Sequence, residues 1–220
     1  MINYQNILIQ NDNHARVFFD MEDAAITNVA KNAQSGTWAG GEIGVSNTAK
    51  FGSNSLDLDL TSTRRIYTFN SSVNFTEGLY FSLFARLTST PTATAAAICL
   101  FESTNERLYL FADTSRRYKV TAFKSGGVVS DALFSSATSL NTWYFIQAYM
   151  TCDNIYMKIG DELVTYTLSA CPDIDATDFI INATTDSGNN KYPGLIDSVI
   201  VKTGMQIPIA TLYNEKNREA

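Results

Sequence analysis

The sequence is poor in charge, in histidine, in cysteine and in long apolar runs. Charged residues make up only 17% of the 220 residues, and 22 Asp and Glu outnumber 16 Lys and Arg, giving a net charge of −6. Because phosphates and anionic lipids attract clustered basic side chains, this balance argues against nucleic acid and membrane surfaces as partners. No apolar run approaches the roughly 18–20 residues that cross a bilayer. The sequence therefore predicts neither nucleic-acid binding nor membrane insertion.

Catalytic chemistry is also short of the residues that it needs. The chain has one histidine, His14, so a Ser or Cys nucleophile would have to share it, and a zinc site would lack a second imidazole. A glycoside hydrolase needs paired carboxylates, and the nearest pair is Asp57 and Asp59, which a strand would place on one face. Two aspartates on a solvated strand face are the ordinary case. We predict that the protein is not an enzyme, with a glycoside hydrolase as the less favoured alternative.

The three cysteines, Cys99, Cys152 and Cys171, cannot all pair. Each lies in or beside an apolar stretch, which favours buried, reduced thiols; a Cys152–Cys171 bridge stays open because spacing does not fix connectivity. The amino terminus lacks the positive flank and the roughly 7–15 apolar residues of an export signal, since its first cation is Arg16. We expect a protein that leaves its cell without that signal, or one whose signal lies outside this sequence.

Apolar side chains at every second position are what the sequence has in abundance. Apolar residues make up 45% of the chain, and one stretch places five of them on one face of a strand, namely Leu79, Phe81, Leu83, Ala85 and Leu87. Further strand-like runs cover residues 15–19, 55–60, 64–69, 95–102, 107–113, 118–124, 142–151, 154–160, 163–168, 178–183 and 195–202. Gaps rich in Gly, Asn, Asp, Ser and Thr separate them. The pattern predicts an all-β fold, an antiparallel two-sheet jelly-roll β-sandwich.

The two ends of the chain differ from its middle. Residues 208–213 begin with Pro208 and carry Ile209, Leu212 and Tyr213, which predicts at most one short carboxyl-terminal helix. We expect an amino-terminal segment over residues 1–14, one sandwich domain over residues 15–213 and a polar tail over residues 214–220.

Five segments, in order, resemble the concanavalin A-like lectin/glucanase superfamily in its laminin G-like branch. Residues 17–22 (Val-Phe-Phe-Asp-Met-Glu) are similar to the first strand of that branch, and residues 51–59 (Phe-Gly-Ser-Asn-Ser-Leu-Asp-Leu-Asp) to its Phe-Gly-x-x-Ala-Leu-x-Phe stretch. Residues 142–150 occupy the place of a strand that usually begins Trp-His-His-Val. Residues 154–164 resemble the hairpin Leu-x-Leu-Tyr-Val-Asp-Gly-x-Leu-Val, and residues 194–201 the closing Gly-x-Ile-Asp-Glu-Val strand. The resemblance implies the sandwich, which hosts lectins, glycan hydrolases and adhesion modules.

The same resemblance implies one structural calcium ion. Many relatives hold calcium at the sheet edge through the Asp of the closing strand and groups near the first strand, and the matching positions here are Asp197 and Asp20. Carboxylate and carbonyl oxygens are the ligands that calcium prefers. The alternative is that Asp197 caps or bridges neighbouring backbone.

Sugar binding usually combines aromatic platforms with amides and carboxylates. The loop over residues 184–192 supplies Asp186, Asn189, Asn190 and Tyr192, and Trp38 lies in a second stretch that we interpret as a flexible loop. Tyrosines at outward strand positions are further candidates, namely Tyr80, Tyr149 and Tyr156.

We therefore predict a non-catalytic carbohydrate-binding or adhesion module. An extracellular type of fold without an export signal, with unpaired cysteines, is typical of a bacteriophage structural protein. The predicted location is the virion surface, as a capsid decoration or a tail-associated protein. The predicted partners are host or mucosal glycans and other virion proteins. The alternatives are a purely structural virion protein that binds only protein, and a secreted lectin-like module on a bacterial surface.

Overall fold

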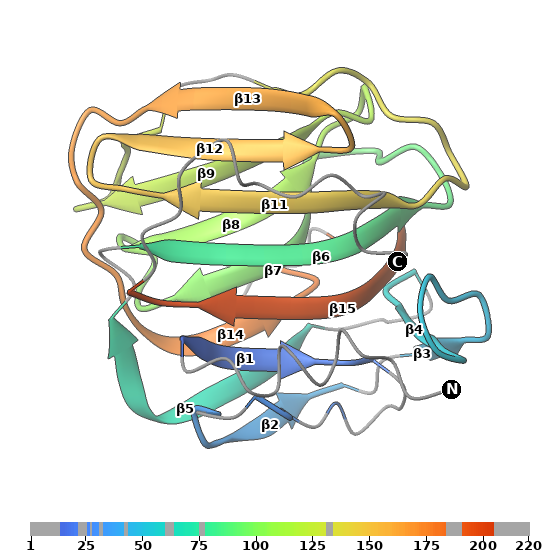
Figure 1. The fold of residues 1–220 in the computed structure, drawn as a ribbon, viewed down its shortest axis with the longest axis horizontal. Coiled ribbons are helices and arrows are strands. Elements are labelled where there is room, and N and C mark those ends of the chain that lie inside the picture. The colour runs from blue at the N-terminus through green and yellow to red at the C-terminus, as the bar shows by residue number, and fades with distance from the viewer. Residues whose placement is uncertain are drawn as a thin grey trace.

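A computed structural model describes residues 14–21, 26, 28–30, 33–41, 44–59, 64–74, 78–130, 134–183 and 191–204. Two antiparallel sheets pack face to face, so the predicted all-β, two-sheet sandwich is confirmed (Figure 1). The predicted helix at residues 208–213, the tail at residues 214–220 and residues 1–13 of the amino-terminal segment lie outside the described residues. No helix in the described part of the chain has the length and apolar character that crossing a membrane requires.

The eight-stranded sheet lies nearer the viewer in Figure 1. Its strands run in the order β13-β12-β11-β6-β15-β4-β3, and β1 pairs with β15 beside this path. The bounds are β1 Ala15–Phe19, β3 Gly44–Ser46, β4 Ser55–Asp57, β6 Leu79–Leu87, β11 Tyr144–Met150, β12 Asn154–Ile159, β13 Glu162–Thr167 and β15 Gly194–Lys202. The first and last described strands are thus neighbours.

The seven-stranded sheet lies behind it, in the order β10-β9-β8-β7-β14-β5-β2. The bounds are β2 Gly36–Gly40, β5 Arg65–Asn74, β7 Ala95–Phe101, β8 Arg107–Ala112, β9 Tyr118–Lys124, β10 Gly127–Val128 and β14 Asp175–Ile181. The hairpin of β8 and β9 is joined by the turn at residues 113–117, where the carboxylate of Asp113 accepts hydrogen bonds from the backbone of Ser115 and Arg117.

The core lies between the sheets and is built from every second residue of each strand. The predicted inward face of β6 is confirmed, because all five of its residues belong to the central apolar cluster. Leu108 and Leu110 of β8 contribute from the opposite sheet, and both are nearly inaccessible. Burying one such side chain stabilises the fold by about 1.5–3 kcal/mol. The alternation therefore fixes which face of each strand turns inward.

The outer face of the eight-stranded sheet departs from the expectation of a solvated surface. Tyr80, Ser82 and Phe84 occupy outward positions on β6, yet their exposures are only 7%, 1% and 0%. The Phe84 ring stacks on Phe145, with ring centroids 4.7 Å apart, and meets Phe51 edge-on at 4.9 Å. This sheet is therefore buried on both faces along its central strands.

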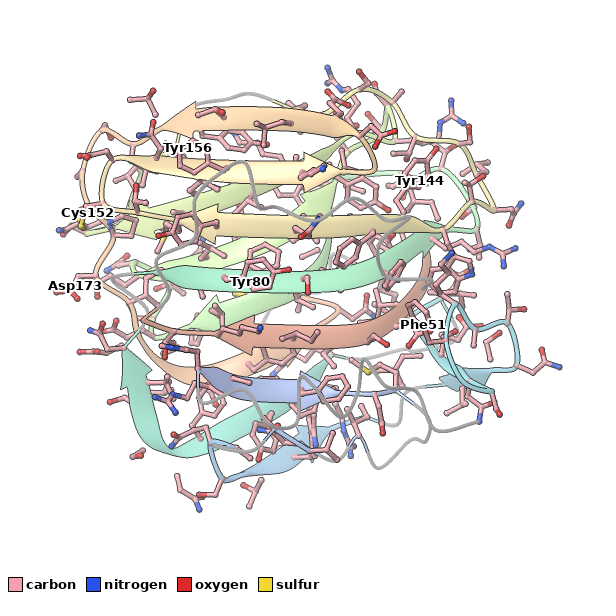
Figure 2. The ribbon with its side chains drawn as sticks, in the orientation of Figure 1. Phe51, Tyr80, Tyr144, Cys152, Tyr156 and Asp173 are labelled. Atoms are coloured by element: carbon pink, nitrogen blue, oxygen red, sulfur yellow. A yellow bond between two sulfur atoms is a disulfide. The ribbon has the colours of Figure 1, made fainter. Side chains whose placement is uncertain are left out.

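The cysteines also differ from the favoured interpretation. Cys99 is buried and free, as predicted. Cys152, in the turn before β12, and Cys171, in the connection before β14, form a disulfide (Figure 2). The interpretation that all three thiols are reduced is wrong for this pair, because β13 and its connections return the chain to the turn that carries Cys152. The bridge that spacing left open is confirmed.

Candidate functional site

Trp38 lies on strand β2 rather than on a flexible loop, which corrects the prediction. Its indole packs between Phe19 and Tyr67, with ring centroids 5.1 and 4.9 Å away, and its Nε1 donates to the backbone oxygen of Ile26 at 2.8 Å. Trp38 forms one wall of a cleft of about 380 Å³ at this edge of the sandwich. A methyl group on neighbouring Gly36 would lie 2.4 Å from a backbone oxygen of β5, which explains the glycine.

The polar groups that line this cleft are already engaged within the protein. The Tyr67 hydroxyl donates to the backbone oxygen of Gln34 at 3.0 Å, and the Gln34 amide donates to Ser71. Asn28 accepts from the backbone of Phe18 and donates to that of Arg16. These bonds hold strand β2 against β1 and β5. The cleft is therefore a hydrogen-bonded edge of the core.

Tyr192 is not the exposed sugar platform that the sequence predicted. It is fully buried, and its hydroxyl forms a short hydrogen bond with the hydroxyl of Tyr118 on β9. The backbone nitrogen of Tyr192 donates to Asn182 Oδ1 at 2.6 Å, which turns the ring inward. The three other residues of that predicted site lie outside the described residues: Asp186, Asn189 and Asn190.

Asp197 is fully buried beside the bulge of β15. Its Oδ2 accepts from the backbone N–H groups of Lys50 and Phe51 at 3.0 and 2.9 Å, and its Oδ1 accepts from the Ser198 hydroxyl at 3.1 Å. The two backbone donors use both lone pairs of Oδ2, so the contacts fit a backbone-bridging carboxylate better than a calcium ligand.

Asp20 is the residue directly after β1. Its neighbour Phe19 pairs with Val199, which lies in the bulge of β15. Across the described residues, no three His, Cys, Asp or Glu side chains gather as a metal site requires. Calcium binding at Asp20 and Asp197 stays a prediction of the sequence.

The three outward tyrosines do come together on the eight-stranded sheet. Tyr149 pairs in register with Tyr80 and with Tyr156, and its ring stacks on that of Tyr156 at 6.4 Å (Figure 2). The Tyr80 hydroxyl donates to Gln147 Oε1 at 3.2 Å. Only Tyr156 is half-exposed, while the other two rings are buried. The cluster therefore offers little accessible ring surface.

A second aromatic cluster lies on the outer face of the seven-stranded sheet, and the sequence reasoning missed it. Alternation along β8 points Arg107, Tyr109 and Phe111 outward, and alternation along β9 does the same for Phe123. The hairpin register sets Arg107 opposite Phe123. We call the half-exposed trio of Arg107, Tyr109 and Phe123 the Arg107 platform.

The Arg107 platform combines ring surface with a cation. The Tyr109 and Phe123 rings stack with centroids 5.8 Å apart and planes 23° apart. The Arg107 guanidinium carbon lies 4.2 Å from the centre of the Phe123 ring and 5.9 Å from that of Tyr109. Burial raises the pKa of Tyr109, and the Arg107 charge opposes that rise, so the hydroxyl stays a donor at neutral pH.

Asp178 of β14 supplies a carboxylate on this face. Phe101 pairs in register with both Asp178 and Arg107, so two strand spacings, about 10 Å, separate the backbones of the charged residues. Threonine hydroxyls from Thr68 and Thr177 donate to the two Asp178 oxygens at 2.6 and 2.8 Å. The sequence carried a signal for the platform, because outward side chains alternate along both residues 107–111 and residues 119–123.

Comparison with solved structures agrees with this architecture. Domain 4 of AbnA, an extracellular arabinanase from Geobacillus stearothermophilus in complex with arabinotriose, matches with a TM-score of 0.65 and 14% identity over 89% of this chain and 95% of that one. The binding domain of botulinum neurotoxin serotype D matches at 0.68 and 10% identity over 94% of this chain and 51% of that one. A Trypanosoma rangeli sialidase in complex with sialic acid matches at 0.62 and 11% identity over 94% and 33%.

At these identities the matches show a shared β-sandwich fold. The chain spans nearly all of the arabinanase domain but about half of the toxin domain and a third of the sialidase. No family model and no curated protein matches the sequence. The protein is thus a jelly-roll sandwich domain of the architecture found in these proteins.

Proposed function

We propose that the protein is a non-catalytic carbohydrate-binding module whose binding surface is the Arg107 platform. The observation that carries the proposal is the stacked, half-exposed pair of Tyr109 and Phe123 with a guanidinium beside it. Sugar rings present C–H faces that pack on aromatic surface, and their hydroxyls need donors and acceptors close by. Among the described residues none accepts a hydrogen bond from the Tyr109 hydroxyl, which leaves that group for a ligand.

We also propose that the module has no catalytic activity. The arrangement of Asp57 and Asp59, the candidate pair of catalytic carboxylates, supports this. Strand β4 ends at Asp57, and the backbone nitrogen of Asp59 donates to Asp57 Oδ1 at 3.1 Å. The two carboxylates therefore belong to a turn and not to one face of a strand. The chain's single histidine is His14, and its Nδ1 lies 3.0 Å from the backbone oxygen of Thr203.

The Cys152–Cys171 disulfide supports a location outside the reducing cytosol, since disulfides persist in oxidising compartments. This supports the alternative to the virion, and we propose that the module acts on an extracellular or bacterial cell surface. Location on a phage particle stays a prediction. The arabinotriose complex of the similar arabinanase domain supports sugar as the ligand class.

A glycan array followed by titration calorimetry tests the proposal. We expect Tyr109→Ala to weaken binding of any array ligand at least about tenfold. The variant loses both the ring on which the sugar packs and the hydroxyl that can hydrogen-bond to it. The matched control is Tyr156→Ala, which removes a half-exposed, stacked tyrosine from the other sheet. Equal loss in the two variants, or no glycan bound by the parent, would refute the proposal.

A protein-binding role is the second candidate, favoured by exposed apolar residues on two edge strands. Leu163 on β13 and Val128 on β10 are 48% and 52% exposed. Edge strands can pair with a strand of another chain. If this role holds, Leu163→Lys lowers self-association or partner binding in sedimentation experiments while Tyr109→Ala leaves it unchanged.

A further inference from the structure

We infer that the Arg107 platform recognises an acidic sugar, one that carries a carboxylate on its ring, such as a uronic or sialic acid. This inference rests on the proposed function and adds the chemical class of the ligand. The relevant observations concern the partners of Arg107 and the charges around it.

Arg107 has no carboxylate partner among the described residues. One of its terminal nitrogens donates to the backbone oxygen of Thr104, its Nε is buried without a hydrogen-bond partner, and no described residue accepts from its other terminal nitrogen. Arg117, only ten positions away, shows what a paired arginine looks like in this protein: its Nε and Nη2 donate to Asp113 Oδ2 at 2.9 and 2.6 Å. The guanidinium of Arg107 therefore keeps its capacity for an anion.

The two strands of the platform carry no carboxylate although the whole chain is acidic, and Glu106 precedes Arg107 in the turn before β8. The outward positions of β8 and β9 carry Arg107 and Lys119 and no carboxylate. Lys119 lies beside the Phe134 ring, 5.4 Å from its centre. Asp178, about two strand spacings from Arg107, is bound by two threonine hydroxyls. An anionic ligand on β8 and β9 thus faces Arg107 with no carboxylate on either strand.

The guanidinium is also oriented for a carboxylate. Its contact with the Phe123 ring holds the guanidinium in one orientation, and a guanidinium held in this way recognises a carboxylate more selectively than a lysine does. The ring centre of Tyr109 lies 5.9 Å from the guanidinium carbon, so the ring and the cation are neighbours on this face. A pyranose stacked on Tyr109 therefore brings a ring carboxylate within reach of Arg107.

The experiment compares acidic sugars with their neutral counterparts on the full chain. The probes are trigalacturonic acid against its methyl ester, and sialyllactose against lactose, titrated by calorimetry. We expect the acidic member of at least one pair to bind about tenfold tighter or more, with the preference weakening as salt rises from about 50 to about 500 mM. The two pairs separate a uronic acid from a sialic acid as the source of the carboxylate.

Variants decide whether Arg107 carries the preference. Arg107→Gln is expected to bind both members of the pair equally, and Arg107→Lys to retain part of the preference. The matched control is Arg65→Gln, since Arg65 also lies over an aromatic ring, 5.5 Å from that of Trp38, at another edge of the sheet. Equal binding of acidic and neutral sugars by the parent, or a preference that survives in Arg107→Gln, overturns this inference and leaves the proposed function standing. Binding of no glycan by any protein overturns the proposed function itself.

Discussion

The hydroxyl pair of Tyr118 and Tyr192 is a direct test of the packing between the sheets. Both rings are fully buried, and each hydroxyl is the other's hydrogen-bond partner. Changing either tyrosine to phenylalanine removes the bond and leaves a hydroxyl buried without a partner, which costs about 2 kcal/mol. Changing both replaces the pair by two apolar rings of similar shape, which is nearly neutral. We therefore expect the double variant to be more stable than either single variant.

Urea unfolding followed by tryptophan fluorescence measures this cycle. Additive behaviour would predict a loss of about 4 kcal/mol in the double variant, so the expected recovery corresponds to a coupling energy of about 3–4 kcal/mol. Tyr166→Phe is the control, because that hydroxyl approaches a weak acceptor, Met157 Sδ at 3.8 Å, and its loss leaves no second hydroxyl unpaired. Simple addition of the two single losses would contradict the mutual pairing.

Three further outcomes follow from the described contacts. Burial raises the pKa of Tyr118, Tyr166 and Tyr192 above the ordinary value near 10, so the folded state retains protons that the unfolded chain releases. The free energy of unfolding is therefore unaffected by these tyrosines below about pH 10 and falls above it by up to about 1.4 kcal/mol per pH unit for each of them. Urea unfolding midpoints measured between about pH 8 and 11 will show this fall. Changing Cys152 and Cys171 to serine opens a loop with a sequence separation of 19 and lowers the unfolding free energy by about 3 kcal/mol, whereas an unchanged midpoint would mean that the bridge is absent in solution. Asp197→Ala leaves two backbone N–H groups without their acceptor and costs about 3 kcal/mol, while a chelator leaves the melting temperature unchanged; a fall of several degrees with chelator would instead support the calcium prediction.

Strands with strict alternation could be predicted from the sequence to within a residue. Residues 15–19, 79–87 and 118–124 form β1, β6 and β9 with the expected bounds. In β9 a shift of one residue would turn Tyr118, Val120 and Ala122 away from the core, so the pattern alone determines its register.

Strand β2 shows where that reasoning ends. Its residues, Gly-Thr-Trp-Ala-Gly, begin and end in glycine and lack an apolar alternation, which is typical of a loop. What makes it a strand is the pairing of Gly36 to Gly40 with β5, from Phe69 to Arg65. The glycine at position 36 fits because a side chain there would strike β5, and this close approach is not visible in a single sequence.

The candidate site was harder to predict than the fold, because residue type does not reveal which outward positions stay accessible. Tyr192 has the right chemistry for a sugar platform, but one hydrogen bond from its backbone to Asn182 and one from its hydroxyl place it in the core. Tyr109 and Phe123 looked like ordinary strand residues. Their clustering beside Arg107 becomes visible only when the register of the β8–β9 hairpin is known.

The two outer faces of the sandwich also explain why we propose recognition on the seven-stranded sheet. Alternation supplies outward aromatic residues to both sheets, but on the eight-stranded sheet Tyr80, Tyr149 and Phe84 are almost inaccessible. On the seven-stranded sheet Tyr109 and Phe123 keep part of their surface, and the cation beside them has no carboxylate partner within the described residues. Aromatic surface that is accessible and lies next to such a cation matches a ligand with both an apolar ring face and a negative charge. An acidic sugar has both of these features on one ring.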